Sequence, residues 1–112
     1  MATPTDQLKE LKKIAQIRFD KERHKLSAIN DEINRLEAER KAVRKKMTDL
    51  TGGSEASPAS LMNAYAYLDA LSKKAGLLEA ERQEARERTK AQREKIKTAL
   101  ASKIRVDDME NS

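Results

Sequence analysis

Residues 50–58 read LTGGSEASP, and this stretch decides the fold because it holds two glycines and a proline within a few residues. Glycine just past a helix end permits the left-handed backbone that turns the chain, which is the role we assign to Gly52 and Gly53. Ser57 followed by Pro58 supplies an N-cap hydroxyl and a proline at the first helical position, the usual start of a helix. The stretch therefore predicts a turn between two helices.

Two long helices are predicted on either side of this turn. At the start of the chain, Thr3-Pro4-Thr5-Asp6 offers an N-cap hydroxyl, a proline at the first helical position and an acid at the third. No glycine or proline follows until the turn. We expect a helix over about 4–51, a turn over 52–57, a second helix over about 58–105 and a frayed acidic tail over 106–112.

Apolar residues recur in both halves at alternating steps of three and four, which is the heptad period of a coiled coil. The stripe of the first half is Leu8, Leu11, Ala15, Phe19, Glu22, Leu26, Ile29, Ile33, Leu36, Arg40, Val43, Met47 and Leu50. The stripe of the second half is Leu61, Ala64, Leu68, Leu71, Ala75, Leu78, Arg82, Ala85, Thr89, Gln92, Ile96, Ala99, Lys103 and Val106. A short turn makes consecutive helices antiparallel neighbours, so the predicted fold is all-α, a single-domain, two-helix antiparallel coiled-coil hairpin.

The position of the turn suggests which residues face one another. Counted from the middle of the turn, residue i lies opposite residue 108 minus i, within about one helical turn. This register places Tyr65 against Val43. It also places Glu22, a polar residue of the first stripe, beside Arg82 and Arg86 of the second. We predict an ion pair there that specifies the register, the best-attested use of buried charge in coiled coils.

The second stripe is not equally apolar along its length. It is apolar to Leu78, poor from Arg82 to Gln92, and partly apolar afterwards. We therefore expect the half of the hairpin near the turn to be well packed and the half near the termini to be held more weakly, which points to a partner. Gly76 costs about 1 kcal/mol relative to Ala. It is either a tolerated weakness or a site of close helix contact.

Composition excludes several classes of protein. Charged residues make up 38% of the chain and there are only three aromatic residues, as in a long helix or coiled coil. The absence of cysteine excludes disulfides, thiolate metal sites and a cysteine nucleophile. No apolar run approaches the ~20 residues of a membrane span, and no signal peptide is visible at the start. The expected location is the cytoplasm.

The sequence predicts no catalytic, metal-binding or cofactor-binding residues. His24 is the single histidine, stands among basic residues, and makes no metal site without cysteine or a second histidine. General acid–base catalysis needs a pocket that shifts pKa values, and a two-helix hairpin offers none for its many carboxylates. We therefore expect a binding protein and not an enzyme.

The net charge of +5 raises the question of a nucleic-acid partner. A basic patch is formed by Lys41, Arg44, Lys45 and Lys46. Acidic residues lie within a helical turn of it, and no aromatic residues are interleaved for bases to stack on. The sequence therefore disfavours nucleic acid, and a basic nucleic-acid-associated coiled coil is the third of the functions considered.

The most distinctive patch opens the second helix and reads LMNAYAYL over 61–68. Met62 and both tyrosines of the chain lie in it. Tyr67 cannot face the same side as Tyr65, so we expect it to be exposed. An exposed tyrosine beside methionine is typical of a protein interface. The alternative is that these residues only cover the end of the hairpin.

Several of these segments together resemble the FliJ family. They are Ile17-Arg18 with Glu22, INRLEAER at 33–40, the turn, SPASL at 57–61 and YLDAL at 67–71. Members of that family are small stalk proteins of the bacterial flagellar export apparatus, and the related YscO-type proteins serve virulence type III secretion. The resemblance is one of pattern and covers nearly the whole chain.

The resemblance implies a hairpin akin to the central stalk of a rotary ATPase, with its terminal end in the export ATPase ring and further contacts to the export gate and substrate chaperones. The residues facing the lumen of the ring would be Lys12, Lys13, Arg18, Lys95 and Lys97. The gate or chaperone contact would use Met62, Tyr65 and Tyr67. The alternative from the sequence itself is a subunit of a helical oligomer, either a prefoldin-like chaperone or a self-associating scaffold.

Overall fold

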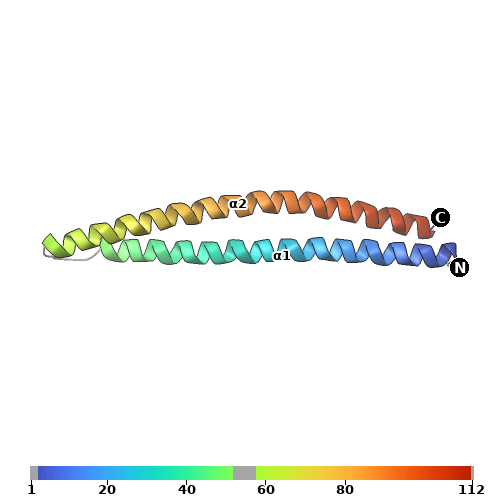
Figure 1. Ribbon diagram of the computed structural model, residues 1–112, viewed down its shortest axis with the longest axis horizontal. Helices are drawn as coiled ribbons and strands as arrows, with labels where there is room; N and C mark the ends of the chain where they lie inside the picture. The colour runs from blue at the N-terminus through green and yellow to red at the C-terminus, as the bar shows by residue number, and fades with distance from the viewer. Residues whose placement is uncertain (1–2, 52–57, 112) are drawn as a thin grey trace. The chain divides into compact units, whose positions relative to one another are not determined.

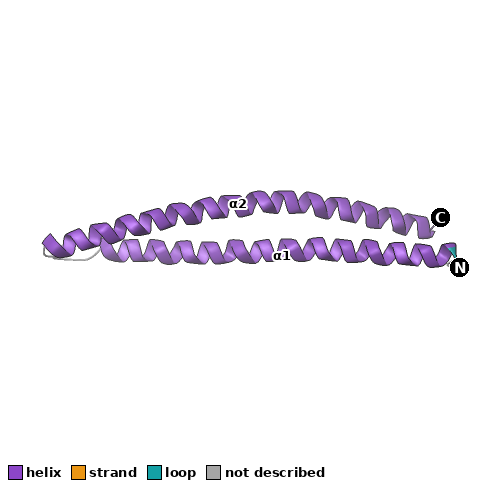
Figure 2. Cartoon of the chain, in the orientation of Figure 1, coloured by secondary structure: helices purple, strands orange, loops and turns teal. Residues whose placement is uncertain are grey.

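The computed structural model describes residues 3–51 and 58–111, and these form two α-helices. Helix α1 is Pro4–Thr51 and helix α2 is Pro58–Asn111 (Figure 1). No strand occurs in the two described ranges (Figure 2). The all-α hairpin is therefore confirmed, with the helix boundaries at Pro4, Thr51 and Pro58 as expected. The predicted turn at 52–57 lies outside the described residues.

Thr3 caps the start of α1. Its hydroxyl oxygen accepts a hydrogen bond of 3.2 Å from the backbone N–H of Asp6. Its own backbone N–H donates to the Asp6 carboxylate at 3.4 Å. This reciprocal pair is a capping box, and it satisfies two backbone donors that have no partner inside the helix. The acid also stands at the positive end of the helix dipole, so the predicted start is explained by local chemistry.

The chain packs as two compact units, and each unit contains a segment of both helices. The loop unit is Asp31–Arg86. The terminal unit is Met1–Asn30 together with Glu87–Ser112. Each unit has its own core and its own polar contacts between α1 and α2, so the two are described separately.

The two helix segments of the loop unit are antiparallel. Arg40 pairs with Glu79 at 3.4 Å, and Glu37 pairs with Arg82 at 3.4 Å, so higher numbers in α1 meet lower numbers in α2. The numbers of each pair add to 119. The predicted register of 108 is therefore wrong by eleven residues, about three helical turns.

The register differs because the apolar stripes set it, and not the midpoint of the turn. A sum of 119 places Thr51, the last residue of α1, opposite Leu68. Figure 1 shows the start of α2 extending past the end of α1. The predicted contact of Tyr65 with Val43 is wrong for this reason: the Tyr65 side chain is exposed, while Val43 is buried.

The core of the loop unit is a single apolar cluster. Its buried members are Leu36, Val43, Leu71, Leu78 and Ala85, and the partly buried Ile33, Met47, Leu50 and Ala75 pack against them. All nine are positions of the predicted stripes. Burial of each large side chain contributes about 1.5–3 kcal/mol, so this cluster is the main source of stability in the unit.

Gly76 lies in the loop unit on the exposed side of α2. A methyl group built on its Cα would meet nothing within 4 Å. Close helix contact at Gly76 is therefore excluded. The remaining explanation is that Gly76 lowers the stability of helix α2 by about 1 kcal/mol relative to Ala and that the fold tolerates this cost.

The core of the terminal unit is made of small and polar side chains. Its buried residues are Ala15, Thr89, Gln92 and Ala99. Every position of the predicted α2 stripe from Ala64 to Val106 is buried or half-buried. The stripe is thus confirmed, including its polar stretch from Arg82 to Gln92. Leu11 is the exception in the α1 stripe, because it is exposed. Larger apolar side chains of the unit are half-buried around these residues: Leu8, Phe19, Leu26, Ile29, Ile96 and Val106.

Two further expectations for the terminal unit differ from the structure. Glu22 does not pair with Arg82 or Arg86, because the shifted register brings Gln92 to it, while Arg82 pairs with Glu37 and Glu79. Helix α2 also continues to Asn111, where a frayed tail was expected after Arg105. The extension is held by an ion pair of 2.7 Å between Glu110 and Lys12 of α1.

Candidate functional site

The net charge of the chain belongs to one unit. The loop unit contains ten basic and ten acidic residues, and the terminal unit contains fourteen basic and nine acidic residues. The whole charge of +5 is therefore carried by the terminal unit. The basic patch around Lys45 lies in the loop unit, where acids balance it. A concentrated positive charge attracts and orients an acidic partner, so the terminal unit is the first candidate for binding.

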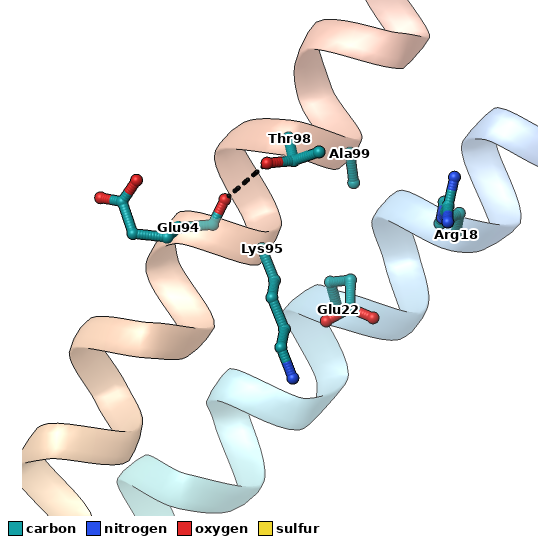
Figure 3. Close-up of a pocket in the computed structure, with 6 residues that line it drawn as sticks. All are labelled: Arg18, Glu22, Glu94, Lys95, Thr98 and Ala99. Atoms are coloured by element: carbon teal, nitrogen blue, oxygen red, sulfur yellow. Dashed lines mark hydrogen bonds between the residues drawn. The ribbon is translucent and has the colours of Figure 1, made fainter.

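Arg18 and Lys95 line one shallow groove of the terminal unit, of about 370 Å³ (Figure 3). The other residues of the groove are Glu22 from α1 and Glu94, Thr98 and Ala99 from α2. Figure 3 shows the Lys95 side chain reaching across to α1, while Glu94 points away from it. The Thr98 hydroxyl donates to the backbone carbonyl of Glu94 at 3.1 Å. The groove therefore contains one cation from each helix, Arg18 and Lys95, with Glu22 between them (Figure 3).

Glu22 is held in this groove by a buried neighbour. The side-chain amide of Gln92 donates to the Glu22 carboxylate at 2.6 Å and to the Glu22 backbone carbonyl at 2.8 Å. The hydrogen bond from Gln92 is the main reason why the pKa of Glu22 lies below its usual value; partial burial opposes it, and Lys25 and Lys95 make smaller contributions in the same direction as Gln92. The carboxylate is thus ionised at neutral pH and joined to α2.

Lys12 and Lys13 lie together at a second shallow depression, of about 450 Å³. Lys9, Gln16 and Glu110 complete its lining. Glu110 accepts a hydrogen bond from the Lys12 ammonium, which raises the pKa of Lys12. Lys13 makes no ion pair with any residue in the described ranges, so its charge remains available to a partner.

Lys97 is separate from both groups. Its ammonium pairs with Glu94 of its own helix at 3.1 Å, and both side chains are largely exposed. The structure thus brings Arg18 together with Lys95, and Lys12 together with Lys13. It leaves Lys97 in a local pair of little energetic weight.

A row of exposed apolar residues on α1 was not predicted. Leu11, Ile14 and Ile17 follow one another at steps of three, and the last two are 62% and 66% exposed. Leu100 and Ile104 are exposed on the α2 segment of the same unit. Exposed isoleucines grouped on a basic surface are typical of a binding site. The signal was present in the sequence as Ile14 and Ile17, two large apolar residues that fall outside the stripe.

Phe19 is the aromatic residue of the terminal unit, and two cations cover it. The guanidinium of Arg23 lies 5.5 Å from the centre of its ring, and the ammonium of Lys103 on α2 lies 5.3 Å from it. Both distances suit cation–π attraction, worth about 0.5–1 kcal/mol at exposed sites. Phe19 therefore links the two helices through charge as well as through apolar contact.

The start of α2 carries the main exposed apolar face of the loop unit. Leu61, Met62 and Tyr65 are neighbours at steps of three and four on a helix, and Met62 and Tyr65 are 73% and 67% exposed. Tyr67 is also exposed, as predicted, but it lies on another side of the helix. We call the first three residues the α2 face.

His24 lies on the exposed surface of α1, as the sequence indicated. Within the described ranges, no group of three or more histidine, cysteine or acidic side chains is arranged to hold a metal ion. Neither described helix contains a stretch that is long and apolar enough to cross a membrane. The search for relatives gave no match among protein-family models, curated proteins or solved structures.

Proposed function

We propose that the protein is a non-enzymatic coiled-coil stalk or adaptor of a bacterial flagellar or type III export apparatus, and that its terminal unit binds the export ATPase ring. The observation that supports this proposal is the position of the charge: the whole +5 lies in the terminal unit, beside exposed apolar residues of α1. Such a protein acts by binding, and its place of action would be the cytoplasm.

The surface of the terminal unit suits a partner with an apolar collar and an acidic rim. Ile14 and Ile17 provide apolar contact area, and burying them would contribute most of the affinity. Lys13 and Arg18 stand next to these isoleucines in the sequence, and their charge favours fast association with acidic residues more than it adds affinity.

The polar core of the terminal unit fits the same role. Gln92 is 5% exposed and reaches Glu22 across the two helices, so a polar contact replaces an apolar layer at this position. Polar residues in a coiled-coil core fix the register at a cost in stability. The folded terminal unit would gain stability when a ring encloses it, because any ligand of the folded state stabilises that state.

The second set of partners in this proposal, the export gate or substrate chaperones, would bind at the α2 face. Met62 and Tyr65 are exposed there, and tyrosine and methionine are enriched at protein interfaces. This assignment gives the two units different partners. Charge would direct the ATPase ring to the terminal unit, and apolar side chains would bind the gate or chaperones at the loop unit.

The test is binding to purified export ATPase from the same organism, measured by sedimentation and by the rate of ATP hydrolysis. We expect the chain to bind the ring and to stimulate hydrolysis. The double substitution Ile14→Asp with Ile17→Asp should weaken binding by at least about tenfold, equivalent to about 1.4 kcal/mol. The matched control is Leu77→Asp, which alters a leucine of equal exposure in the loop unit and should leave binding unchanged.

Two results would contradict the proposal. The first is a failure of the unaltered, helical chain to bind the ring at tens of micromolar. The second is equal weakening by the double substitution and by Leu77→Asp, because binding would then not reside in the terminal unit.

A further inference from the structure

The last five residues of α2 include three acids and no basic residue. They are Asp107, Asp108 and Glu110, and the helix ends at Asn111. Carboxylates are unfavourable at this end of a helix, because the helix dipole and the unpaired carbonyl groups of the last turn are also negative. A positive charge from outside α2 is therefore needed to hold this end in the helical form.

α1 supplies that positive charge within the terminal unit. The Lys12 ammonium donates a hydrogen bond of 2.7 Å to the Glu110 carboxylate. This contact is the main reason why the pKa of Lys12 is raised, and the charge of Asp107 acts in the same direction. The acidic end of α2 is thus bound by a lysine of α1.

Lys12 belongs to a group of lysines on one side of α1. Lys9, Lys12 and Lys13 are three or four residues apart, so they are neighbours on the helix surface. All three line the depression of about 450 Å³, and Glu110 is the acidic member of that lining. Lys9 and Lys13 form no ion pair within residues 3–51 and 58–111. We call the three lysines the lysine face.

The ion pair between Lys12 and Glu110 is weak enough to be replaced. The Lys12 side chain is 51% exposed and that of Glu110 is 46% exposed. Ion pairs between exposed side chains typically contribute about 0–1 kcal/mol. A partner with several carboxylates gains attraction from all three lysines, whereas the single carboxylate of Glu110 pairs only with Lys12.

We propose that the lysine face binds an acidic segment of a protein partner, and that the acidic end of α2 is a built-in competitor for that segment. The group already bound there indicates the chemistry of the partner, because it is a carboxylate presented by a helix. The net charge of +5 on the terminal unit attracts such a segment.

The competitor makes the lysine face selective. Glu110 is part of the same folded unit, so its effective concentration at Lys12 is on the order of millimolar. A single carboxylate in solution therefore does not displace it. A segment with several adjacent acids displaces it, since its carboxylates reach Lys9, Lys12 and Lys13 together.

This inference deepens the proposed function, because the lysine face belongs to the unit assigned to the ATPase ring, and it rests on that function only for the identity of the partner. Glu110 would then lower the affinity of the chain for the ring until an acidic part of the ring takes its place on Lys12. The binding of acidic segments is a property of the chain and is tested without the ring.

The test is binding of fluorescent poly-L-glutamate to the chain alone, measured by anisotropy at low ionic strength, where exposed charges are least screened. Glu110→Gln should tighten binding about two- to fivefold, because it frees Lys12. Lys12→Gln should weaken binding by a similar factor. The matched control is Asp108→Asn, which removes the same charge from an exposed acid that forms no ion pair with Lys12, and it should change binding less than about twofold.

A double substitution tests whether Glu110 acts through Lys12. In the Lys12→Gln chain, Glu110→Gln should have no more effect than Asp108→Asn, because no paired lysine is left to release. Circular dichroism of each variant checks that the helices are intact.

The proposal is overturned if Glu110→Gln and Asp108→Asn tighten binding alike, since net charge alone would then explain the gain. It is also overturned if Glu110→Gln keeps its full effect in the Lys12→Gln chain, or if the chain binds phosphatidylserine vesicles but not poly-L-glutamate. None of these measurements contains an ATPase, so their failure is distinct from a failure of the chain to bind the ring.

Discussion

The loop unit and the terminal unit share a heptad stripe but use it differently. The loop unit buries Leu36, Val43, Leu71 and Leu78 in one apolar cluster and has no net charge. The terminal unit buries alanines, a threonine and a glutamine, and carries all of the net charge. The difference is one of chemistry: apolar side chains fill the centre of the loop unit, whereas small and polar side chains are the fully buried residues of the terminal unit.

The largest effect expected from a single substitution is the loss of the loop core. Leu36 is 1% exposed, and Leu36→Ala should reduce the free energy of unfolding by about 2–5 kcal/mol, because it removes buried side-chain volume and leaves a cavity. Urea unfolding followed by circular dichroism measures the change. Leu77→Ala, at a 66% exposed position of α2 in the same unit, is the control and should stay within about 0.5 kcal/mol. Equal effects at both positions would show that the buried cluster is not the main source of stability in the loop unit.

The sequence predicted this core well because a heptad stripe needs only local spacing. Leu36, Val43, Leu71 and Leu78 were all assigned to the stripes, and all are buried. The boundaries at Pro4, Thr51 and Pro58 followed equally well from prolines and glycines, whose backbone preferences are local, whereas the end of α2 at Asn111 did not.

The register could not be predicted in the same way. Counting from the midpoint of the turn predicted that Tyr65 contacts Val43 of α1. In the structure the apolar stripes align α2 with α1 about three helical turns away from that predicted register. A connection of several residues between two helices is too long to determine which residues of one helix face which residues of the other. The exposure of Tyr65, the pairing of Glu22 with Gln92 and the extension of α2 past the end of α1 all follow from that shift.

The candidate binding residues were predicted in part. Arg18, Lys95, Lys12 and Lys13 do gather on the terminal unit, but the row formed by Ile14 and Ile17 was missed. The exposure of Ile14 and Ile17 depends on which side of α1 is covered by α2, and the spacing of residues within α1 alone does not determine this. The sequence also did not reveal that the terminal unit carries the whole net charge, because that unit combines segments from both helices and its boundary does not coincide with the turn.

A smaller effect on stability is expected in the terminal unit, from the contact between Glu22 and Gln92. The pKa of Glu22 is below its usual value of 4.5, so its interaction with Gln92 stabilises the folded state above that pH and is lost as the pH falls through the folded-state pKa. Glu22→Gln should therefore be less stable than the unaltered chain at pH 7, and the gap should close on acidification toward pH 3. Thermal unfolding at a series of pH values measures this.

Glu10→Gln is the matched control for this titration, since it removes an exposed carboxylate of the same helix. A gap between Glu22→Gln and the unaltered chain that stays constant from pH 7 to pH 3 would show that the contact with Gln92 does not depend on the charge of Glu22.

Hydrogen exchange of the backbone amides, measured with and without the export ATPase ring, tests the central claim most directly. In the free chain we expect slow exchange in the loop unit and faster exchange in residues 4–30 and 87–111, because amides in weakly packed regions open more readily. Addition of the ring should slow exchange in those terminal segments and leave 31–51 and 68–86 unchanged. Equal protection of both units in the free chain, or a gain confined to the loop unit, would contradict the account.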